Sequence, residues 1–553
     1  MFPDVEKQMN STRAIGILIL ICLLCLVPFL NKAFNIDDPT FIGMAKHIQS
    51  NPLDYFGYYM QFSPPVITNP PLVAYFIAIA GYFFGYSEIS LHAAFLLPAC
   101  AVIVGTYLLA RDLCTNPFIA ALAALCTPVF IVSSTTVMCD VLMLSFWVFS
   151  IYYWRRGIIE DKRVFLLIAS ALITFCILTK YSGICLVPLL LAYSLYEKRK
   201  PGEWLIYLLL PIASILLFDQ ITYIKYGLRQ LSYIESFSIY NQNTSHKNTL
   251  ANIVSGLSFL GGCILIQWLY FVVHTKKLLI FLYLAAIVSM LIIFIKFNLL
   301  NYYPITTPDG INWVFVAQLP FFVFAGVSFI FIVASDFSRN RDSDSLLLFL
   351  WVMGTFAFTI FVNWSVNARS ILPIAPIAGI MAMRHLRQLN KLNVNVMRGL
   401  YAPIILSLFM ALIVTSADYS LANSARTAAH TIHKTIINFP GKVWLEGHWG
   451  FQYYIESTGG VKSLNYDNPS LKKGDLVIIP GNNTNTKLLY KHLAILKNEF
   501  EFDVSKKIST MNVSTGAGFY SDLSGPLPFA VGYTPEKYYV YEMVIDKKTK
   551  FTY

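Results

Sequence analysis

The chain has 553 residues, of which 56% are hydrophobic and only 13% are Asp, Glu, Lys or Arg, about half the usual charged fraction of roughly 25%. This composition excludes an ordinary soluble enzyme, and it excludes intrinsic disorder because disorder requires low hydrophobicity and high charge. The net charge of +11 does not indicate a nucleic-acid partner, since most basic residues lie in short clusters between apolar runs. All nine cysteines precede residue 300, so the polar C-terminal region must fold without disulfides.

Apolar runs of membrane-spanning length recur from residue 13 to residue 416. A helix needs about 20 apolar residues to cross a hydrocarbon core of ~30 Å. The candidate spans are 13–30, 71–86, 89–110, 117–135, 138–154, 164–180, 183–197, 203–222, 252–274, 278–298, 313–334, 346–363, 369–387 and 399–416. Because no small-residue cleavage site follows the first run, we interpret it as a retained transmembrane helix and not as a signal peptide.

Clusters of Lys and Arg in every second loop predict the orientation of these helices. The clusters are Arg155, Arg156, Lys162 and Arg163; Lys198, Arg199 and Lys200; Lys276 and Lys277; Arg339 and Arg341; and Arg384, Arg387, Lys391 and Arg398. Cytoplasmic loops are enriched in these residues, so we expect all five clusters on the cytoplasmic side. The counts from both directions agree if 71–86 lies along the outer interface, which leaves about 13 crossings. In the alternative, 71–86 crosses and a neighbouring run does not.

The composition changes after Thr415, and residues 417–553 carry 15 Lys and Arg against 12 Asp and Glu. We expect a soluble α/β domain here, with strands at 442–445 and 475–480 and a short helix at 451–457. The Gly447-His448-Trp449-Gly450 segment before that helix predicts a tight turn with one packed aromatic side chain; a ligand site is the less favoured interpretation. An odd number of crossings places this domain outside the cytoplasm.

Two adjacent carboxylates, Asp37 and Asp38, follow the outer end of the first membrane helix. Pro39 suits the first turn of a new helix, whose N-terminus favours nearby negative charge. Taken alone, either Asp is an ordinary N-cap residue. Both predicted topologies place the pair in an outer loop, 31–69.

Other polar residues are expected at the same membrane depth. Asn69 opens the interfacial segment, Asp140 begins a helix, Lys180 ends one, and Arg369 begins another. Each cation singly is also consistent with a side chain that reaches to the interface. Together, the acids and cations predict a site that binds a phosphate and deprotonates a hydroxyl.

The ordered motifs resemble glycosyltransferase family 39, a group of GT-C membrane enzymes that includes protein O-mannosyltransferases and lipid A aminoarabinose transferases. The motifs are Asp37-Asp38, Pro70-Pro71-Leu72, Asp140 and Leu178-Thr179-Lys180, with a later element at Asn367-Ala368-Arg369 and Leu372-Pro373. The resemblance implies a GT-C-like fold and transfer of a sugar from a polyprenyl-phosphate carrier to an acceptor hydroxyl. It makes Asp37 the catalytic base, with Asp38 the acid beside it and Asp140 a second acid near the donor. Lys180 and Arg369 are expected to bind the donor phosphate.

The chain departs from the family pattern at Asn69, where relatives have His or Lys, and at His92, where Arg is frequent. Near Thr40 the aminoarabinose enzymes carry Arg, so that substrate is not favoured. We expect Asn69, His92, Tyr55 and Tyr59 to contact substrate, although an interfacial aromatic belt also explains the two tyrosines. No His/Cys cluster indicates a metal site; no cofactor is required, and a divalent cation between the three aspartates is an open alternative.

We therefore expect an inverting glycosyltransferase in the bacterial inner or plasma membrane, with a lipid, glycan or protein acceptor and no nucleic-acid partner. A transporter or lipid flippase is the first alternative, but it favours charges near the midplane and paired halves, and no repeat is visible. A polymerase or ligase with a diphosphate carrier is the second, and it favours a large late outer loop rich in Arg and His.

Overall fold

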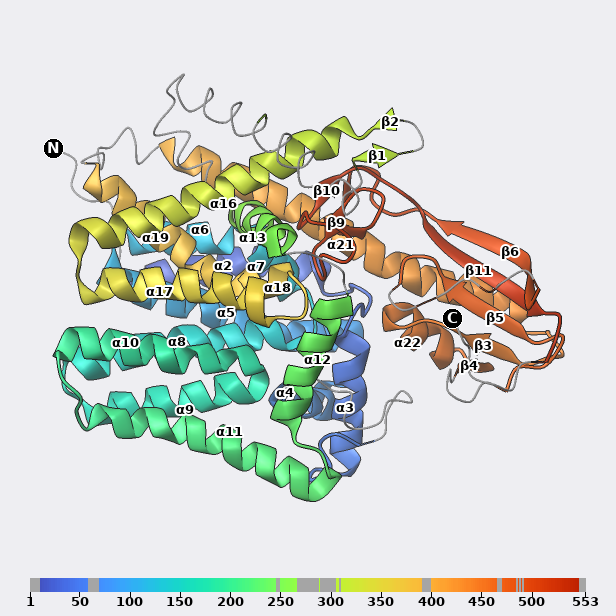
Figure 1. Cartoon of the computed structure of the whole chain (residues 1–553), viewed down its shortest axis with the longest axis horizontal. Helices are drawn as coiled ribbons and strands as arrows, with labels where there is room; N and C mark the ends of the chain where they lie inside the picture. Colours follow the sequence, from blue (N-terminus) through green and yellow to red (C-terminus); the bar gives the residue numbers. More distant parts are fainter. Residues whose placement is uncertain are drawn as a thin grey trace.

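The computed structural model describes residues 10–57, 69–244, 249–265, 288, 305–307, 310–389, 399–464, 470–483, 486, 489 and 492–546. A bundle of long helices is joined at one end to a smaller region that contains a β-sheet (Figure 1). The helices are α2 (Ser11–Leu26), α3 (Asp38–Ser50), α4 (Leu72–Phe84), α5 (Glu88–Leu113), α6 (Pro117–Leu125), α7 (Pro128–Ser134), α8 (Cys139–Ile159), α9 (Arg163–Thr179), α10 (Leu186–Lys198), α11 (Trp204–Tyr226), α12 (Gln230–Thr244), α13 (Thr249–Ile264), α16 (Trp313–Asn340), α17 (Ser343–Ala357), α18 (Ala368–Ile371), α19 (Ala375–Gln388), α21 (Tyr401–Ile436) and α22 (Trp449–Ser457). Short turns are η1 (Val27–Phe29), η3 (Tyr181–Cys185), η5 (Phe358–Val362) and η6 (Leu372–Ile374).

The expected helical membrane domain is present, but its 13 crossings are not confirmed. By length and composition, 6 helices of the described residues suffice to cross a membrane: α2 with η1, α5, α11, α16, α17 with η5, and α21. The α6 and α7 pair, bent by 62°, would make a seventh. Pro128 at the start of α7 explains this bend, since proline cannot continue the preceding helix. The expected span at 278–298 lies, apart from residue 288, outside the described residues.

Two helices near the sheet region run across the ends of the long helices instead of alongside them. Figure 1 shows α3 and α12 in this orientation, and α4 packs between α3 and α5. With 13 residues, α4 is about 20 Å long, shorter than a hydrocarbon core of ~30 Å. These observations support an interfacial position for residues 71–86, which stays a prediction.

Three of the basic loops lie together at the opposite end of the bundle. Arg155 Nε donates to Asp344 Oδ1 at 2.7 Å, joining the C-terminal part of α8 to the start of α17. Lys198 Nζ, at the end of α10, donates to Asp161 Oδ1 at 2.5 Å. The structure thus gathers these loops on one face, as the charge pattern predicts.

The C-terminal region is built on a five-stranded mixed sheet with the order β4-β3-β5-β11-β6. The strands are β1 (Thr306–Thr307), β2 (Gly310–Ile311), β3 (Val443–Leu445), β4 (Val461–Ser463), β5 (Leu476–Pro480), β6 (Ala494–Phe502), β7 (Ile508–Ser509), β8 (Met511–Asn512), β9 (Ala517–Gly518), β10 (Ala530–Val531) and β11 (Glu536–Met543). β3 pairs in parallel with β4 and β5, whereas β11 is antiparallel to β5 and β6. β3, α22 and β5 lie where the sequence predicts two strands and a helix.

The central strand β5 is buried on both faces. Leu476 and Ile478 join the main hydrophobic core, while Val477 and Ile479 belong to a second cluster on the other face. This alternation follows from the two-residue period of a strand. α21 contacts α22, β6 and β11, so this long helix connects the sheet region to the bundle.

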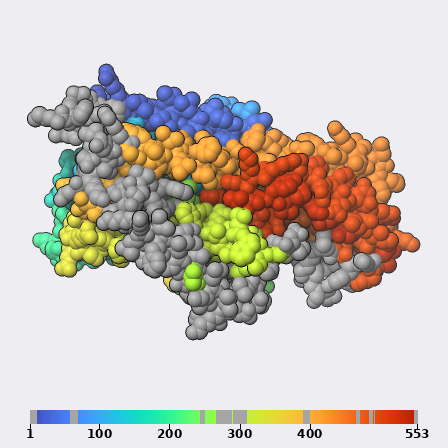
Figure 2. All heavy atoms as spheres, turned by 90° about the horizontal axis from the view of Figure 1, so that it is seen from above, coloured from blue at the N-terminus to red at the C-terminus, as the bar shows by residue number. Residues whose placement is uncertain are grey.

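α21 runs for 36 residues without a break at residue 416. Figure 2 shows its orange residues passing from the bundle to the red C-terminal residues. The change in composition therefore falls inside a continuous helix. A domain boundary at 416/417 stays a prediction.

The chain between β6 and β11, the 503–535 segment, returns to the bundle. The backbone N–H of Ala368 donates to Phe519 O at 2.9 Å, and Gln318 Nε2 donates to Phe529 O at 2.9 Å. Val366 exchanges two hydrogen bonds with Asp522, one through the Asp522 carboxylate. This segment is consequently fixed to the loop that precedes α18.

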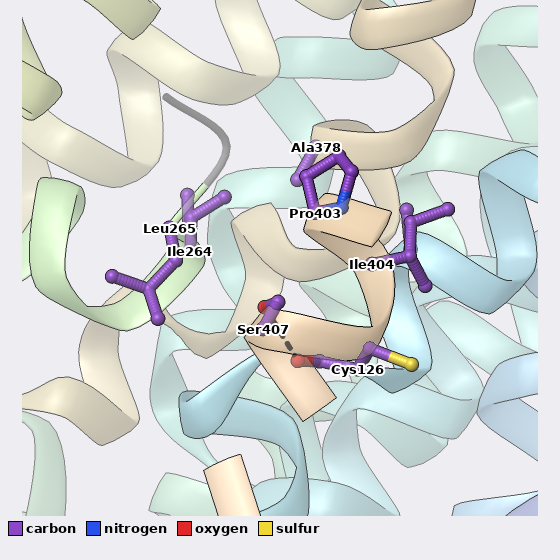
Figure 3. A pocket seen from close by; sticks show the side chains of 8 residues that line it. Cys126, Ile264, Leu265, Ala378, Pro403, Ile404 and Ser407 are labelled. Carbon is purple, nitrogen blue, oxygen red and sulfur yellow. Dashed lines mark hydrogen bonds between the residues drawn. The ribbon is translucent and has the colours of Figure 1, made fainter. Parts of the chain in front are cut away.

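A small void within the bundle is a packing defect and not a ligand site. Figure 3 shows Cys126, Ile264, Leu265, Ala378, Pro403, Ile404 and Ser407 around it. The void has a volume of about 10 Å³, which is no more than one water molecule needs. The Ser407 hydroxyl at its edge already donates a hydrogen bond to Cys126 O at 2.8 Å.

Candidate active site

A cavity of about 760 Å³ lies at the end of the bundle where the 503–535 segment docks. Asp37, Asn69, Lys180 and Arg369 line it. Four residues selected from the sequence, separated by up to 332 positions, therefore face one space. Asp140 lies directly behind its wall.

The α8–α9 hairpin positions Asp140 and Lys180. Asp140 is the second residue of α8, and Lys180 is the residue after α9, so the antiparallel hairpin brings both to the same end. Lys180 Nζ donates to Asp140 Oδ1 at 2.6 Å. Asp140 is only 1% exposed, and a buried carboxylate needs such a partner.

Arg369 connects this pair to Asp37. It lies in the single turn α18, where the Asn367 side chain accepts a hydrogen bond from the Ser370 N–H at 2.9 Å. Arg369 Nη1 is 2.7 Å from Asp37 Oδ2 and 3.8 Å from Asp140 Oδ2. The four groups thus alternate in charge, in the order Asp37, Arg369, Asp140, Lys180.

This charged chain is incompletely hydrogen-bonded. Among the described residues, neither Arg369 Nε nor Asp140 Oδ2 has a hydrogen-bond partner. Arg369 Nη1 contacts Met138 Sδ at 3.1 Å, and a thioether is a weak acceptor. Arg369 lines the cavity with an incompletely paired guanidinium, so it retains capacity for an anionic ligand; the unpaired Asp140 oxygen can only accept a hydrogen bond and does not add to this capacity.

Asp37 does not act as the helix cap that its position suggests. It precedes α3, yet its carboxylate accepts no capping hydrogen bond within the described part of the helix. Instead it points to Arg369 and is 39% exposed to the cavity side. The preceding Ile36 has a φ of +51°, which is strained for a β-branched residue, and such strain clusters at functional sites.

Asp38 has a different role from its neighbour. Its side chain is fully buried, and its two oxygens accept hydrogen bonds from the Asn35 N–H at 3.0 Å and the Val137 N–H at 2.8 Å. Burial raises the pKa of Asp38 to about 7, although these two hydrogen bonds and the charge of Lys32 act in the opposite direction. Asp38 therefore braces the loop beside Asp37, and it does not line the cavity.

One wall of the cavity is largely apolar and includes side chains that are exposed on the outside of the bundle. It is formed by α12, the π-helical turn η5 and the residues after that turn. Its apolar side chains are Leu231, Ile234, Phe237, Ile239, Phe358, Phe361, Val362 and Trp364, and α12 also contributes Glu235, Ser238 and Gln242. Phe361, Val362 and Ile239 are each more than 50% exposed. An apolar chain can therefore lie against this wall while its polar end reaches Arg369.

The remaining wall comes from the C-terminal region. Trp449, Met511, Tyr520 and Ser521 line the cavity opposite the helices. Sequence reasoning missed all four as site residues. The only signal for them was the Gly447-His448-Trp449-Gly450 motif, which we interpret from sequence as a packed turn.

The other expected substrate contacts are placed as follows. Tyr55 lies in an aromatic cluster with Phe56, Phe218 and Tyr226 and hydrogen-bonds Thr222 at 2.9 Å, outside the cavity lining. His92 is buried, stacks on Phe34 and does not line the cavity either. Asn69 lines the cavity beside Cys139. Tyr59 lies outside the described residues.

The carboxylates are not arranged as a cation site. Each Asp38 oxygen accepts a hydrogen bond from a backbone N–H group. The Arg369 guanidinium lies between Asp37 and Asp140, where a bound cation would have to lie. Within the described ranges, no three His, Cys, Asp or Glu side chains form a group that would hold a metal ion. The residues present therefore do not fit the divalent cation that the sequence left open.

Comparisons with known proteins bear on the family resemblance and the fold. A family model described as dolichyl-phosphate-mannose-protein mannosyltransferase matches residues 68–222, which include Asn69, Asp140 and Lys180. No curated protein sequence matches the chain.

Several solved structures share the fold. The archaeal oligosaccharyltransferase AglB from Archaeoglobus fulgidus, in complex with an inhibitory peptide and a dolichol-phosphate, is 15% identical, with 86% of this chain and 70% of that chain covered and a TM-score of 0.50. ArnT from Cupriavidus metallidurans in the apo state is 12% identical, with 85% and 93% covered and a TM-score of 0.53. ArnT bound to undecaprenyl phosphate is 12% identical, with 85% and 94% covered and a TM-score of 0.50. The matched segment and the shared fold together confirm the resemblance expected from the sequence: residues 68–222 are similar to dolichyl-phosphate-mannose-protein mannosyltransferases, and the chain shares the fold of AglB and ArnT, as expected for a protein that resembles family 39.

Proposed function

We propose that the chain transfers a sugar from a polyprenyl-phosphate carrier to an acceptor hydroxyl at the outer face of a bacterial plasma membrane, with inversion at the anomeric carbon. The observation that carries this proposal is one cavity lined by the carboxylates of Asp37 and Glu235, by the cations of Lys180 and Arg369, and by a largely apolar wall, with Asp37 paired to Arg369. The carrier lipid would lie against α12 and η5, and its phosphate would meet Arg369 and Lys180. ArnT in the related fold has been solved with undecaprenyl phosphate.

Asp37 acts as the base in this reaction. It takes the proton of the acceptor hydroxyl as the acceptor oxygen bonds to the anomeric carbon. The bond between that carbon and the phosphate oxygen breaks, and its electron pair stays on the phosphate. Arg369 and Lys180 neutralise the charge that develops there.

The ion pair between Asp37 and Arg369 couples the two steps. A carboxylate that is held by a guanidinium is not free to accept a proton. A donor phosphate competes for the same guanidinium and thereby releases Asp37 toward the acceptor. The site then becomes reactive only when the donor is bound.

The transport alternative is not favoured. Its charges should lie midway along the helices, whereas Asp37, Asp140, Lys180 and Arg369 gather at one end.

Mass spectrometry of lipids and surface glycans from cells with and without the gene tests the proposed reaction. We expect one hexose or pentose to disappear from a lipid, glycan or protein acceptor while its polyprenyl-phosphate donor accumulates. Unchanged acceptors and carriers would contradict the proposal.

The proposed orientation places the C-terminal region outside the cytoplasm. Ser457 is exposed at the end of α22, and residues 417–553 contain no cysteine, so a Ser457→Cys variant adds one accessible thiol to this region. In intact cells it should react with a membrane-impermeant maleimide, after outer-membrane permeabilisation where an outer membrane exists, and more than the wild type does. Reaction only after lysis would reverse the topology.

A further inference from the structure

Two contacts join the C-terminal region to the two partners of the Asp37–Arg369 pair. One involves the first turns of α22 and the loop that carries Asp37. The other involves Tyr520 and the guanidinium of Arg369. Both connect parts of the chain that are more than 100 residues apart.

The first contact is made by Gly450. A Cβ atom at this position would lie 2.2 Å from the carbonyl oxygen of Phe34, so only glycine allows this approach. One turn later, the Tyr454 hydroxyl accepts a hydrogen bond from the Phe34 N–H at 2.8 Å and donates to Glu88 Oε1 at 2.8 Å. The start of α22 is therefore seated on the backbone just before Asp37.

The two segments have strained backbones where they meet. Ile36 has a φ of +51° and Trp449 a φ of +66°, and both residues line the same cavity. Non-glycine residues adopt such values only where their surroundings impose them. Packing that maintains two strained residues beside the proposed base indicates that their positions serve the site.

The second contact is made by Tyr520. Its ring centroid lies 5.7 Å from Arg369 Cζ, within the range of a cation–π interaction. Its hydroxyl donates to Asp418 Oδ2 at 2.7 Å. Tyr520 is thus fixed at its hydroxyl end while its ring faces the arginine.

Asp418 is held in turn by a buried cluster. Lys32 Nζ donates to Asp418 Oδ2 at 2.5 Å, and both side chains are fully buried. The Thr510 hydroxyl donates to Asp418 Oδ1 at 3.0 Å. The cluster joins α21 to the first outer loop and to the 503–535 segment, and both of these contribute residues to the cavity lining.

We propose that the C-terminal region is an integral part of the active site, in which Gly450 positions Asp37 and Tyr520 positions Arg369. Neither residue takes part in bond formation; each acts through the group that it holds. The proposal rests on the reaction described above and adds a role for the C-terminal region in it.

Four variants of the full-length chain separate positioning from folding. Gly450→Ala forces the two backbones apart, and a displacement of about 1 Å at a catalytic group is worth about a hundredfold in rate. Tyr520→Leu removes both contacts of the ring, and we expect about a thirtyfold loss, whereas Tyr520→Phe keeps the ring over Arg369 and should lose about threefold. Gly354→Ala is the control, because no described atom lies within 4 Å of its added Cβ.

Two readouts decide the proposal. The first is the amount of glycosylated product in a deletion strain that expresses each variant, normalised to folded protein by thermal unfolding. The second is the binding of undecaprenyl phosphate to the purified chain in detergent. We expect Gly450→Ala to lose product while it still binds the lipid, and Tyr520→Leu to lose both.

Wild-type product from folded Tyr520→Leu and Gly450→Ala would overturn the proposal. If Gly450→Ala does not fold, the graded loss from Tyr520→Phe to Tyr520→Leu supports it, and wild-type product from both Tyr520 variants overturns it. If the wild type makes product but does not bind undecaprenyl phosphate, the carrier named in the proposed function is wrong. The amounts of product made by the variants then decide the role of the C-terminal region.

Discussion

Each end of the helical bundle buries an arginine, and the two differ in how fully their hydrogen bonds are satisfied. Arg384, at the end with the basic loops, is 12% exposed and donates to Asp336, Ser345 and the Leu113 carbonyl from all three nitrogens. Arg369, at the other end, is 14% exposed, but its Nε has no partner among the described residues.

The difference separates a structural ion pair from a ligand site. A buried charge is stable when its donors have acceptors, and at Arg384 each of the three nitrogens has one. An unpaired donor costs about 1–3 kcal/mol, and Arg369 has one where a cavity of about 760 Å³ can admit a ligand. The two arginines are buried to a similar extent, but we expect substitution of Arg369 to lower activity and substitution of Arg384 to lower stability.

The largest expected effect is that of Asp37→Asn, which removes the proposed base without changing the side-chain volume. General-base catalysis contributes about 10²–10⁴-fold, so we expect activity to fall by about a thousandfold. Thermal unfolding should stay close to the wild type, because Asp37 is 39% exposed. Product measured in the deletion strain checks this, and activity within threefold of the wild type would remove Asp37 from the mechanism.

The next largest effect is expected when Arg369 and Arg384 are each replaced by Ala and the two variants are compared. Arg369→Ala should lower activity about a hundredfold, with donor use impaired more than acceptor use, and Lys180→Ala should act in the same direction. Arg384→Ala leaves Asp336 buried without its cation and should cost ~3–5 kcal/mol of stability. Kinetics and thermal unfolding of both variants check the contrast. Equal losses of stability would show that the two sites are alike.

Asp38→Asn should have a smaller effect on activity. An amide replaces one of the two carboxylate oxygens that accept from the Asn35 and Val137 N–H groups, so one hydrogen bond is lost and the loop loosens. We expect about a tenfold loss, accompanied by a lower unfolding temperature. A loss as large as that of Asp37→Asn, with unchanged stability, would assign direct chemistry to Asp38.

The smallest effect concerns stability and not activity. Burial raises the pKa of Glu536 from its usual 4.5 to about 7, although Asn482 donates a hydrogen bond to it at 2.8 Å. The folded state therefore holds this proton more tightly, and stability falls as the pH rises from about 4.5 to 7, by at most about 3 kcal/mol.

Glu536→Gln should remove that penalty, because its carbonyl can still accept from Asn482. We expect a higher unfolding temperature than the wild type at pH 8 and the same temperature at pH 4.5. A substitution at Asp503, whose side chain is 70% exposed, is the control. If Glu536→Gln changed the unfolding temperature equally at both pH values, the raised pKa of Glu536 would not explain the pH dependence of stability.

The part of the site that could be predicted from sequence is the part built by helix ends. Asp140 begins α8 and Lys180 follows α9, so a helical hairpin alone brings them together. The alternation of basic loops placed Asp37 and Arg369 at the same depth without any knowledge of packing.

The C-terminal contribution could not be predicted in this way. Tyr520 reaches Arg369 because the 503–535 segment leaves the sheet and docks on the loop before α18, and no periodic pattern encodes that contact. Trp449 lies in a motif that is more typical of a packed turn than of a ligand site. For Tyr55, the interfacial aromatic interpretation was available from sequence, and the structure places its ring in an aromatic cluster outside the cavity.

Binding of undecaprenyl phosphate to the purified wild type, Arg369→Ala and Asp37→Asn tests most directly whether Arg369 exchanges Asp37 for the donor phosphate. If it does, Arg369→Ala binds at least tenfold more weakly than the wild type. Asp37→Asn, which no longer competes for the guanidinium, binds at least as tightly as the wild type although it is inactive. Equal binding by Arg369→Ala and the wild type, or weaker binding by Asp37→Asn, would contradict the exchange.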